Sequence, residues 1–340
     1  MMKKILSVAL VALMLLAAFA GCGKTEAKTL KMGMGVHAYY EAAQSADGDT
    51  NGVGEVIATV AAVLVDKDGK IVKCEIDTAD NTVEFTSAGA AVPAGEFTTK
   101  YALGTNYNMA VYGADLNGDG VVKEWFEQAD AFEAACVGKT VDEVKALLAD
   151  GYYGTEELAK AGCTIGVADF VKAVEKAMAT AADANATAAD TLKVSIVSTA
   201  AGTDATADAP GSYEMEIAFA AAAVKDGKVT AMATDMLAAA FDFDAKGATT
   251  TDVAAELKTK NELGTAYNMA AYGTDLNGDG VVKEWNEQAA IFSAACVGLT
   301  ADEIAALVAA DGYYGVESVQ TAGCTMGIDM LAKAAVNAAK

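Results

Sequence analysis

Two β-rich runs and the turn between them decide the fold: Val56-Ile-Ala-Thr-Val-Ala-Ala-Val-Leu-Val65, Lys67-Asp-Gly-Lys70 and Ile71-Val-Lys-Cys-Glu-Ile-Asp77. Asp-Gly between two such runs is the preferred signal of a type I′ hairpin turn. The same turn returns in the second half of the chain as Lys225-Asp-Gly-Lys228. The sequence therefore predicts one β-hairpin in each half.

Outward from the hairpins, the chain repeats itself. The matching blocks are 103–110 with 263–270, 115–125 with 275–285, and 134–138 with 294–298. The period is far too long for a solenoid, so it indicates a duplicated domain. We expect a first domain at 30–178, a polar linker at 179–191 and a second domain at 192–340, with each domain folding independently.

Helices are expected after each hairpin. One helical face is predicted from the spacing of Val122, Trp125, Ala129, Phe132 and Cys136, and another from Val282, Trp285, Ala289, Phe292 and Cys296. Capping boxes announce further helices at Thr140–Glu143 and Thr300–Glu303. A last helix is expected from the spacing of Val167, Phe170, Val171, Val174 and Met178. A hairpin followed by helices predicts an α+β fold, an antiparallel sheet packed with several helices in each repeat.

The chain is strongly acidic, with a formal net charge of −23 and 24 basic residues among 340. This balance argues against nucleic acid and anionic lipid headgroups as partners. Its single histidine, His37, has no counterpart in the second half, and no zinc-ligand spacing or Ser-His-Asp set is present. The sequence thus predicts a carrier or binding protein more readily than an enzyme.

The amino terminus is typical of an exported lipoprotein. A basic start and an apolar stretch lead to Ala20-Gly21-Cys22, which predicts a signal peptide at 1–21, lipidation of Cys22 and a tether at 22–29. An ordinary signal peptide cut nearby and an uncleaved anchor are the alternatives. Lipidation would hold the protein on the extracellular face of the cell membrane.

Five further cysteines follow Cys22. Those of the two halves correspond, and an exported chain tolerates disulfides, so Cys136–Cys163 and Cys296–Cys324 are candidate bridges. Cys74 has no counterpart in the second half. The alternative is that the corresponding cysteines are small buried hydrophobes.

Ala-Gly-Cys-Thr occurs twice, at 161–164 and 322–325, each time before an expected helix. The free N–H groups and dipole of a helix N-terminus favour anions, and glycine lets the backbone approach closely. A phosphate-bearing group attached to Thr164 and Thr325 is one interpretation, with Gly162, Cys163, Gly323 and Cys324 around it. In the other interpretation, Thr164 only caps the helix that follows.

Asp-Leu-Asn-Gly-Asp-Gly also occurs twice, and it matches the first half of an EF-hand loop. The oxygen ligands would come from Asp115, Asn117, Asp119, Asp275, Asn277 and Asp279. Position twelve, where a bidentate glutamate belongs, is Phe126 or Asn286. A weak calcium site and a plain tight turn are both consistent with this pattern.

Taken together, three features resemble the FMN-binding domain family. They are the strand-Asp-Gly-Lys-strand opening, the run from Lys123-Glu-Trp-x-Glu-Gln-Ala129 to Val137-Gly-Lys-Thr-x-Asp-Glu143, and the glycine-threonine ending. In that family a flavin transferase esterifies FMN to the threonine of a Ser/Thr-Gly-Ala-Thr motif. The resemblance implies Thr164 and Thr325 as acceptors, although cysteine here replaces the alanine of the motif.

Two such units behind a lipidated cysteine are similar to the tandem flavin lipoproteins of Gram-positive extracellular electron transfer. The resemblance implies a membrane electron donor such as a quinone-linked dehydrogenase, and acceptors outside the cell. The flavin would supply the redox chemistry, while the protein would hold and tune it. The alternative from another class is a cofactor-free surface lipoprotein with weak calcium-binding loops, acting as a binding or structural module.

Overall fold

The computed structural model describes residues 29–113, 115, 118 and 120–340. The predicted signal peptide, the lipidated Cys22 and the tether to residue 28 lie outside these described residues. Within the described ranges, none of the helices has the length and apolar character that crossing a bilayer would take.

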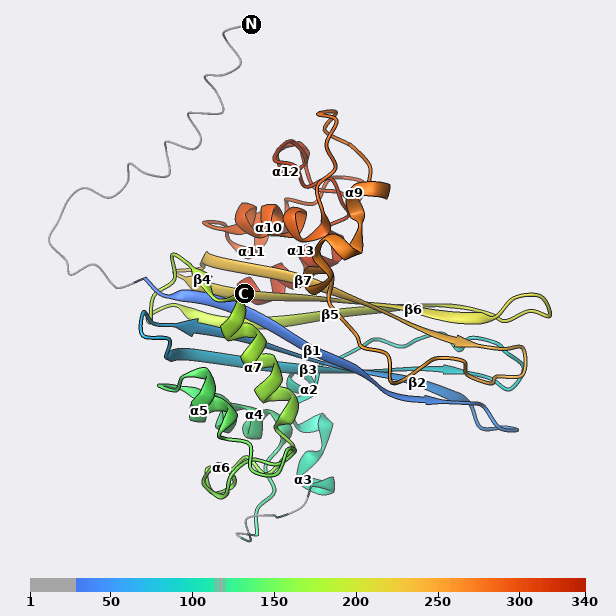
Figure 1. Cartoon of the computed structure of the whole chain (residues 1–340), viewed down its shortest axis with the longest axis horizontal. Coiled ribbons are helices and arrows are strands. Elements are labelled where there is room, and N and C mark those ends of the chain that lie inside the picture. The colour runs from blue at the N-terminus through green and yellow to red at the C-terminus, as the bar shows by residue number, and fades with distance from the viewer. Residues whose placement is uncertain (1–28, 114, 116–117, 119) are drawn as a thin grey trace, which may run out of the picture.

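Two antiparallel sheets form the centre of the molecule. The first comprises β1 (Lys31–Gln44), β2 (Gly52–Val65), β3 (Ile71–Phe85) and the short β4 (Ala182–Asp183), in the order β3-β2-β1-β4. The second comprises β5 (Thr191–Thr203), β6 (Gly211–Lys225) and β7 (Lys228–Phe243), in that order. Their strands run along the long axis of the molecule as two layers (Figure 1). The α+β fold class is confirmed.

Both hairpins form, but with different turns. In the second half Asp226 and Gly227 both have positive φ, 51° and 74°, as the predicted type I′ turn requires. In the first half only Gly69 has positive φ, and the backbone N–H groups of Asp68 and Lys70 donate to the Asp66 carboxylate. The first loop has three residues, 67–69, between Asp66 and Lys70, whereas the second has two, 226–227, between Lys225 and Lys228. The extra residue selects a type I turn followed by a left-handed glycine.

Helices cover the outer face of each sheet (Figure 1). On the first they are α2 (Lys100–Leu103), η1 (Gly104–Tyr107), α3 (Met109–Tyr112), α4 (Trp125–Cys136), α5 (Val141–Lys145), α6 (Glu156–Lys160) and α7 (Ala168–Thr180). On the second they are α8 (Lys260–Leu263), η2 (Gly264–Tyr267), α9 (Met269–Tyr272), α10 (Trp285–Cys296), α11 (Ala301–Ala305), α12 (Glu317–Thr321) and α13 (Asp329–Ala339). The predicted helical faces are buried, except that Val122 and Val282 precede α4 and α10 and that Met178 of α7 is only half-buried. Both capping boxes form.

The two halves share one hydrophobic core. The inner faces of the sheets meet there, so that Val60 and Leu64 of β2 lie in the same buried cluster as Phe219 and Leu237 of the second sheet. Separate clusters lie between each sheet and its own helices. This shared core argues against the expectation that each half folds independently, because each half alone would expose an apolar sheet face.

The predicted linker is packed against both halves rather than extended. Thr180 ends α7, β4 pairs with β1, and Ala186 and Asp190 are fully buried. The Asp190 carboxylate accepts a hydrogen bond from Thr230 Oγ1 at 2.6 Å, and its carbonyl accepts one from Lys73 Nζ at 2.6 Å. Small and polar residues alternate in this segment, so its composition does not indicate which of its positions are buried.

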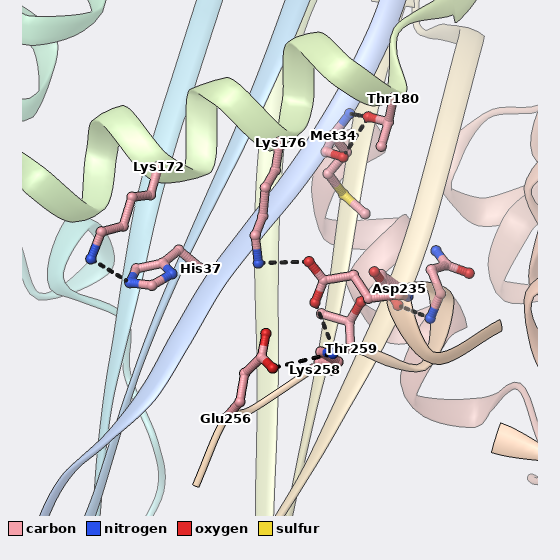
Figure 2. A network of polar contacts seen from close by, with 11 residues as sticks. Met34, His37, Lys172, Lys176, Thr180, Asp235, Glu256, Lys258 and Thr259 are labelled. Atoms are coloured by element: carbon pink, nitrogen blue, oxygen red, sulfur yellow. Dashed lines mark hydrogen bonds and ion pairs between the residues drawn. The ribbon is translucent and has the colours of Figure 1, made fainter. Parts of the chain in front are cut away.

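Helix α7 lies directly on β1. Built onto Gly33, a Cβ atom would come within 1.9 Å of the Ala177 carbonyl oxygen, so the glycine is what permits the approach. At the other side α7 reaches the second half, where Lys176 Nζ lies 2.6 Å from Glu262 (Figure 2). The helix is therefore fixed by the first sheet and braced by the second repeat.

Candidate functional site

The first half contains a pocket of about 390 Å³ on the outer face of its sheet, which we call the first-half pocket. Because side chains alternate along a strand, Thr59 of β2 points away from the shared core and toward the helices. Its lining includes Tyr39, Glu41, Glu55, Thr59, Thr78, Asp80, Lys100, Tyr107, Trp125, Gln128, Tyr152, Tyr153, Thr164, Ile165 and Asp169. The pocket is large enough for a small organic ligand.

Thr164 is held in this pocket by Gln128 of α4. The Gln128 side-chain oxygen accepts hydrogen bonds from the Thr164 N–H at 2.7 Å, the Ile165 N–H at 3.1 Å and the Thr164 hydroxyl at 3.0 Å. Its amide group donates in turn to the Lys123 carbonyl at 2.8 Å. One glutamine thus fixes the loop that carries the predicted acceptor threonine.

Thr164 does not cap the following helix, because the N-cap of α7 is Val167 and that of α13 is Ile328. The capping interpretation is wrong. The expectation that the threonines stand at a helix N-terminus is wrong as well. Each belongs to a loop upstream of the helix, in a geometry that glycine sets: Gly162 and Gly323 both have φ of +101°.

A lysine lies beside each of these glycines. At Gly162 a Cβ atom would come within 2.1 Å of Lys123 Nζ, and at Gly323 within 2.5 Å of Lys283 Cε. The absent side chain of glycine therefore makes room for a cation next to the threonine loop. An ammonium group in this place would favour an anionic group on Thr164.

The floor of the first-half pocket is charged. Lys100 Nζ lies 3.1 Å from Asp80, and Tyr39 donates a hydrogen bond to Asp169 at 3.0 Å. Partial burial raises the pKa of Glu55 to about 7, and the hydrogen bond to Asp80 and the negative charge of Asp80 act in the same direction. Carboxyl groups outnumber the one lysine of the lining, so this floor favours a ligand that is neutral or cationic where it meets the sheet.

The equivalent region of the second half is filled. Gln288 holds the Thr325 and Met326 N–H groups at 2.7 and 2.9 Å, which repeats the clamp of the first half. Yet Thr325 is only 4% exposed, while Thr164 is partly exposed. Buried methionines occupy the positions equivalent to three lining residues of the first half. The pairs are Met236 and Thr78, Met326 and Ile165, and Met330 and Asp169. The two copies of the motif are therefore not equivalent.

The cysteines beside the threonines are buried thiols. Cys163 is 1% exposed and Cys324 fully buried, and burial raises the pKa of each to about 12. All five described cysteines, Cys74, Cys136, Cys163, Cys296 and Cys324, are free in the structure. Neither candidate bridge, Cys136–Cys163 or Cys296–Cys324, is formed in the structure.

The second Asp-Leu-Asn-Gly-Asp-Gly loop, 275–280, is a tight turn, and the described residues of the first loop repeat its hydrogen bonds. Asp275 accepts hydrogen bonds from the N–H groups of Gly278 and Gly280 at 2.8 and 2.9 Å, and Asp115 does the same with Gly118 and Gly120. Asn277 and Asp279 bond to each other, whereas Asn117 and Asp119 lie outside the described residues. Among the residues with described positions, no group of three or more His, Cys, Asp or Glu side chains could hold a metal ion. The turn interpretation accounts for every contact of Asp275.

Sequence reasoning missed the residues that give this site its shape. Gln128 recurs as Gln288, in each half five residues after a Val-Lys pair, and this recurrence is the sequence signal of a shared role. Lys100 and Asp80 come from segments that are distant in sequence and meet only through the sheet. Trp125, Tyr152 and Tyr153 also line the pocket and give it aromatic surfaces.

Comparison with known proteins returned no match: no protein-family model, no curated protein and no solved structure is similar to this chain.

Proposed function

We propose that this protein is a lipid-tethered extracellular electron carrier that holds one FMN, esterified to Thr164 in the first-half pocket. The single observation that carries the proposal is the position of Thr164, partly exposed at a pocket of about 390 Å³ that Trp125 and Tyr152 also line. FMN, when bound, supplies one- and two-electron chemistry.

The residues fit the two ends of the group differently. Aromatic side chains of the lining offer stacking surfaces for a flat ring. Lys123, beside Gly162, offers a positive charge for a phosphodiester on Thr164. The carboxylates Glu55, Asp80 and Asp169 oppose a free phosphate on the floor, so the phosphate would remain at the loop while the ring enters the pocket.

The second half does not fit the group in the same way. Thr325 is buried, and buried methionines stand at three of the positions that line the first-half pocket. We therefore confine the proposal to one flavin for each chain, on Thr164. The partners implied are a flavin transferase, a membrane electron donor and extracellular acceptors.

The experiment is co-expression of the full-length chain with a flavin transferase, followed by denaturation, flavin fluorescence and tryptic mass spectrometry. We expect one covalent flavin on residues 161–172, its loss in Thr164→Ala and its retention in the matched control Thr325→Ala. Thr164→Ser keeps the hydroxyl and should retain part of the attachment. Flavin on Thr325 would overturn the assignment, and flavin that is released on denaturation would show that binding is not covalent.

A second candidate function is a cofactor-free surface lipoprotein. The observation in its favour is the filled second half, where the repeated motif has become part of a packed core. Complete absence of flavin from the purified chain, with and without the transferase, would support this function over the first.

A further inference from the structure

The first half holds three buried cysteines in the core between its sheet and its helices: Cys74, Cys136 and Cys163. Two hydrogen bonds fix how α4 lies on β3. At one end the Gly138 N–H donates to the Ile71 carbonyl at 2.7 Å, and at the other the Ile76 N–H donates to Glu133 Oε1 at 2.7 Å. The helix therefore runs antiparallel to the strand over this stretch.

Cys74 lies between Ile71 and Ile76 on the strand, and Cys136 lies between Glu133 and Gly138 on the helix. The two anchoring bonds consequently place these thiols opposite each other. Cys74 is 6% exposed and Cys136 fully buried, and the interaction with the nearby Cys136 side chain, together with burial, raises the pKa of Cys74. Among the described residues, no comparable hydrogen bonds hold the Cys163 segment against β3.

We infer that Cys74 and Cys136 form a structural disulfide when the chain folds in an oxidising compartment. The two thiols would lose two protons and two electrons and gain one S–S bond. The acceptor is the disulfide of oxidised glutathione or of a thiol–disulfide oxidoreductase, which is reduced to two thiols. Because buried thiols are out of reach of an external oxidant, the bond must form while the chain is still folding.

The second half is an internal control. One of the two anchoring hydrogen bonds recurs there, with the Gly298 N–H donating to the Val229 carbonyl at 2.8 Å. Met232 stands at the position of Cys74, however, so Cys296 faces a thioether that cannot form a bridge. The inference predicts a thiol at Cys296 under the conditions that oxidise the first half.

The test refolds the full-length chain in a glutathione redox buffer, alkylates it in denaturant without reductant, and maps tryptic peptides. Each cysteine of the first half falls in a different peptide, 74–100, 124–139 or 161–172. We expect 74–100 linked to 124–139, and two fewer alkyl groups than after reduction. A link between 124–139 and 161–172, or full alkylation without reductant, would overturn the inference.

Variants separate the bridge from general misfolding. Cys163→Ala should retain the 74–136 link, whereas Cys136→Ala should lose it and leave Cys74 open to alkylation. Reduction of the folded wild type should be slow, and the bridged form should melt roughly 5 to 10 °C above the reduced form. If Cys163→Ala abolishes the link while the protein still melts cooperatively, the pairing assigned here is wrong. Neither result depends on whether flavin binds.

Discussion

Phe85 and Phe243, at equivalent positions of the two halves, stack on each other with ring centroids 4.4 Å apart and planes 2° apart. Reciprocal hydrogen bonds accompany the stack. The Ala46 N–H donates to the Gly247 carbonyl at 2.8 Å, and the equivalent Ala205 N–H donates to the Gly89 carbonyl at 2.7 Å. Each half thus uses the same surface against the other, as the subunits of a symmetric dimer do.

Truncation of either stacked ring should destabilise the whole chain. Both phenylalanines are at most 1% exposed, so we expect Phe85→Ala and Phe243→Ala each to lower the free energy of unfolding by about 3 to 5 kcal/mol. Because the rings contact each other, the double variant should lose less than the sum of the two. Urea unfolding measures this. Tyr112→Ala, at an 80% exposed side chain, is the control and should have little effect.

An isolated second half should not be a stable monomer. A chain of residues 191–340 would expose the inner faces of β5, β6 and β7, including the fully buried Phe219 and Leu237. Since the interface is the same surface on both halves, we expect this fragment to associate with itself. Sedimentation should show a dimer or larger species. A cooperatively melting monomer would show that the shared core is dispensable.

Loss of the glutamine clamp should loosen the Thr164 loop. In Gln128→Ala the N–H groups of Thr164 and Ile165 lose their acceptor, and the Lys123 carbonyl loses its donor. Unpaired buried polar groups cost about 1 to 3 kcal/mol each, so we expect a loss of about 2 kcal/mol or more. Hydrogen exchange at 164 and 165 should rise together. Slow exchange at both positions in the variant would mean that another group holds the loop.

The sequence predicted the local elements well and the relation between the halves poorly. The Asp-Gly turns, the capping boxes at Thr140 and Thr300 and the buried face of α4 depend on neighbouring residues, and they appear where expected. The shared core depends on two sheet faces meeting, and both faces of β2 are apolar, so period-two patterning gave no sign of it. The filled second pocket likewise depends on Met236, Met326 and Met330 converging from separate segments.

Glycine at 35 should be required for the docking of α7. A Cβ atom there would lie 2.3 Å from the Ala177 backbone nitrogen and 2.5 Å from the Ala173 carbonyl oxygen, so the backbone of α7 would have to move. We expect Gly35→Val to cost about 3 kcal/mol or more by overpacking. Gly95→Ala is the matched control, since nothing lies within 4 Å of its Cβ position. Equal melting temperatures for the two variants would contradict this account.

Stability should also depend on pH through a partly buried carboxyl group. Glu133 lies against β3, where its Oε1 accepts a hydrogen bond from the Ile76 N–H. Burial and the neighbouring charge of Glu75 raise its pKa from 4.5 to about 9. The equivalent residue in the second half is Ser293, which is neutral and bonds to Thr234 at 2.9 Å.

Between pH 4.5 and pH 9 the folded chain therefore holds a proton at Glu133 that the unfolded chain has released. When the native state binds more protons, stability falls as pH rises. We expect the free energy of unfolding to be at least about 1 kcal/mol lower at pH 8.5 than at pH 5.5, since one pKa unit corresponds to about 1.4 kcal/mol. Glu133→Gln should reduce this difference. A residual is expected from Glu55 and Glu75, whose pKa values are raised to about 7, and from Asp77 and Asp235, whose pKa values are raised to about 6.

Glu143→Gln is the control for this measurement. The Thr140 backbone N–H lowers the pKa of Glu143, so it is ionised in both states throughout this range and its loss should leave the pH difference unchanged. Urea unfolding at the two pH values gives the comparison. Equal stability of the wild type at pH 5.5 and pH 8.5 would show that Glu133 titrates as an exposed carboxyl group does. A pH difference that persists in full in Glu133→Gln would place the proton on another group.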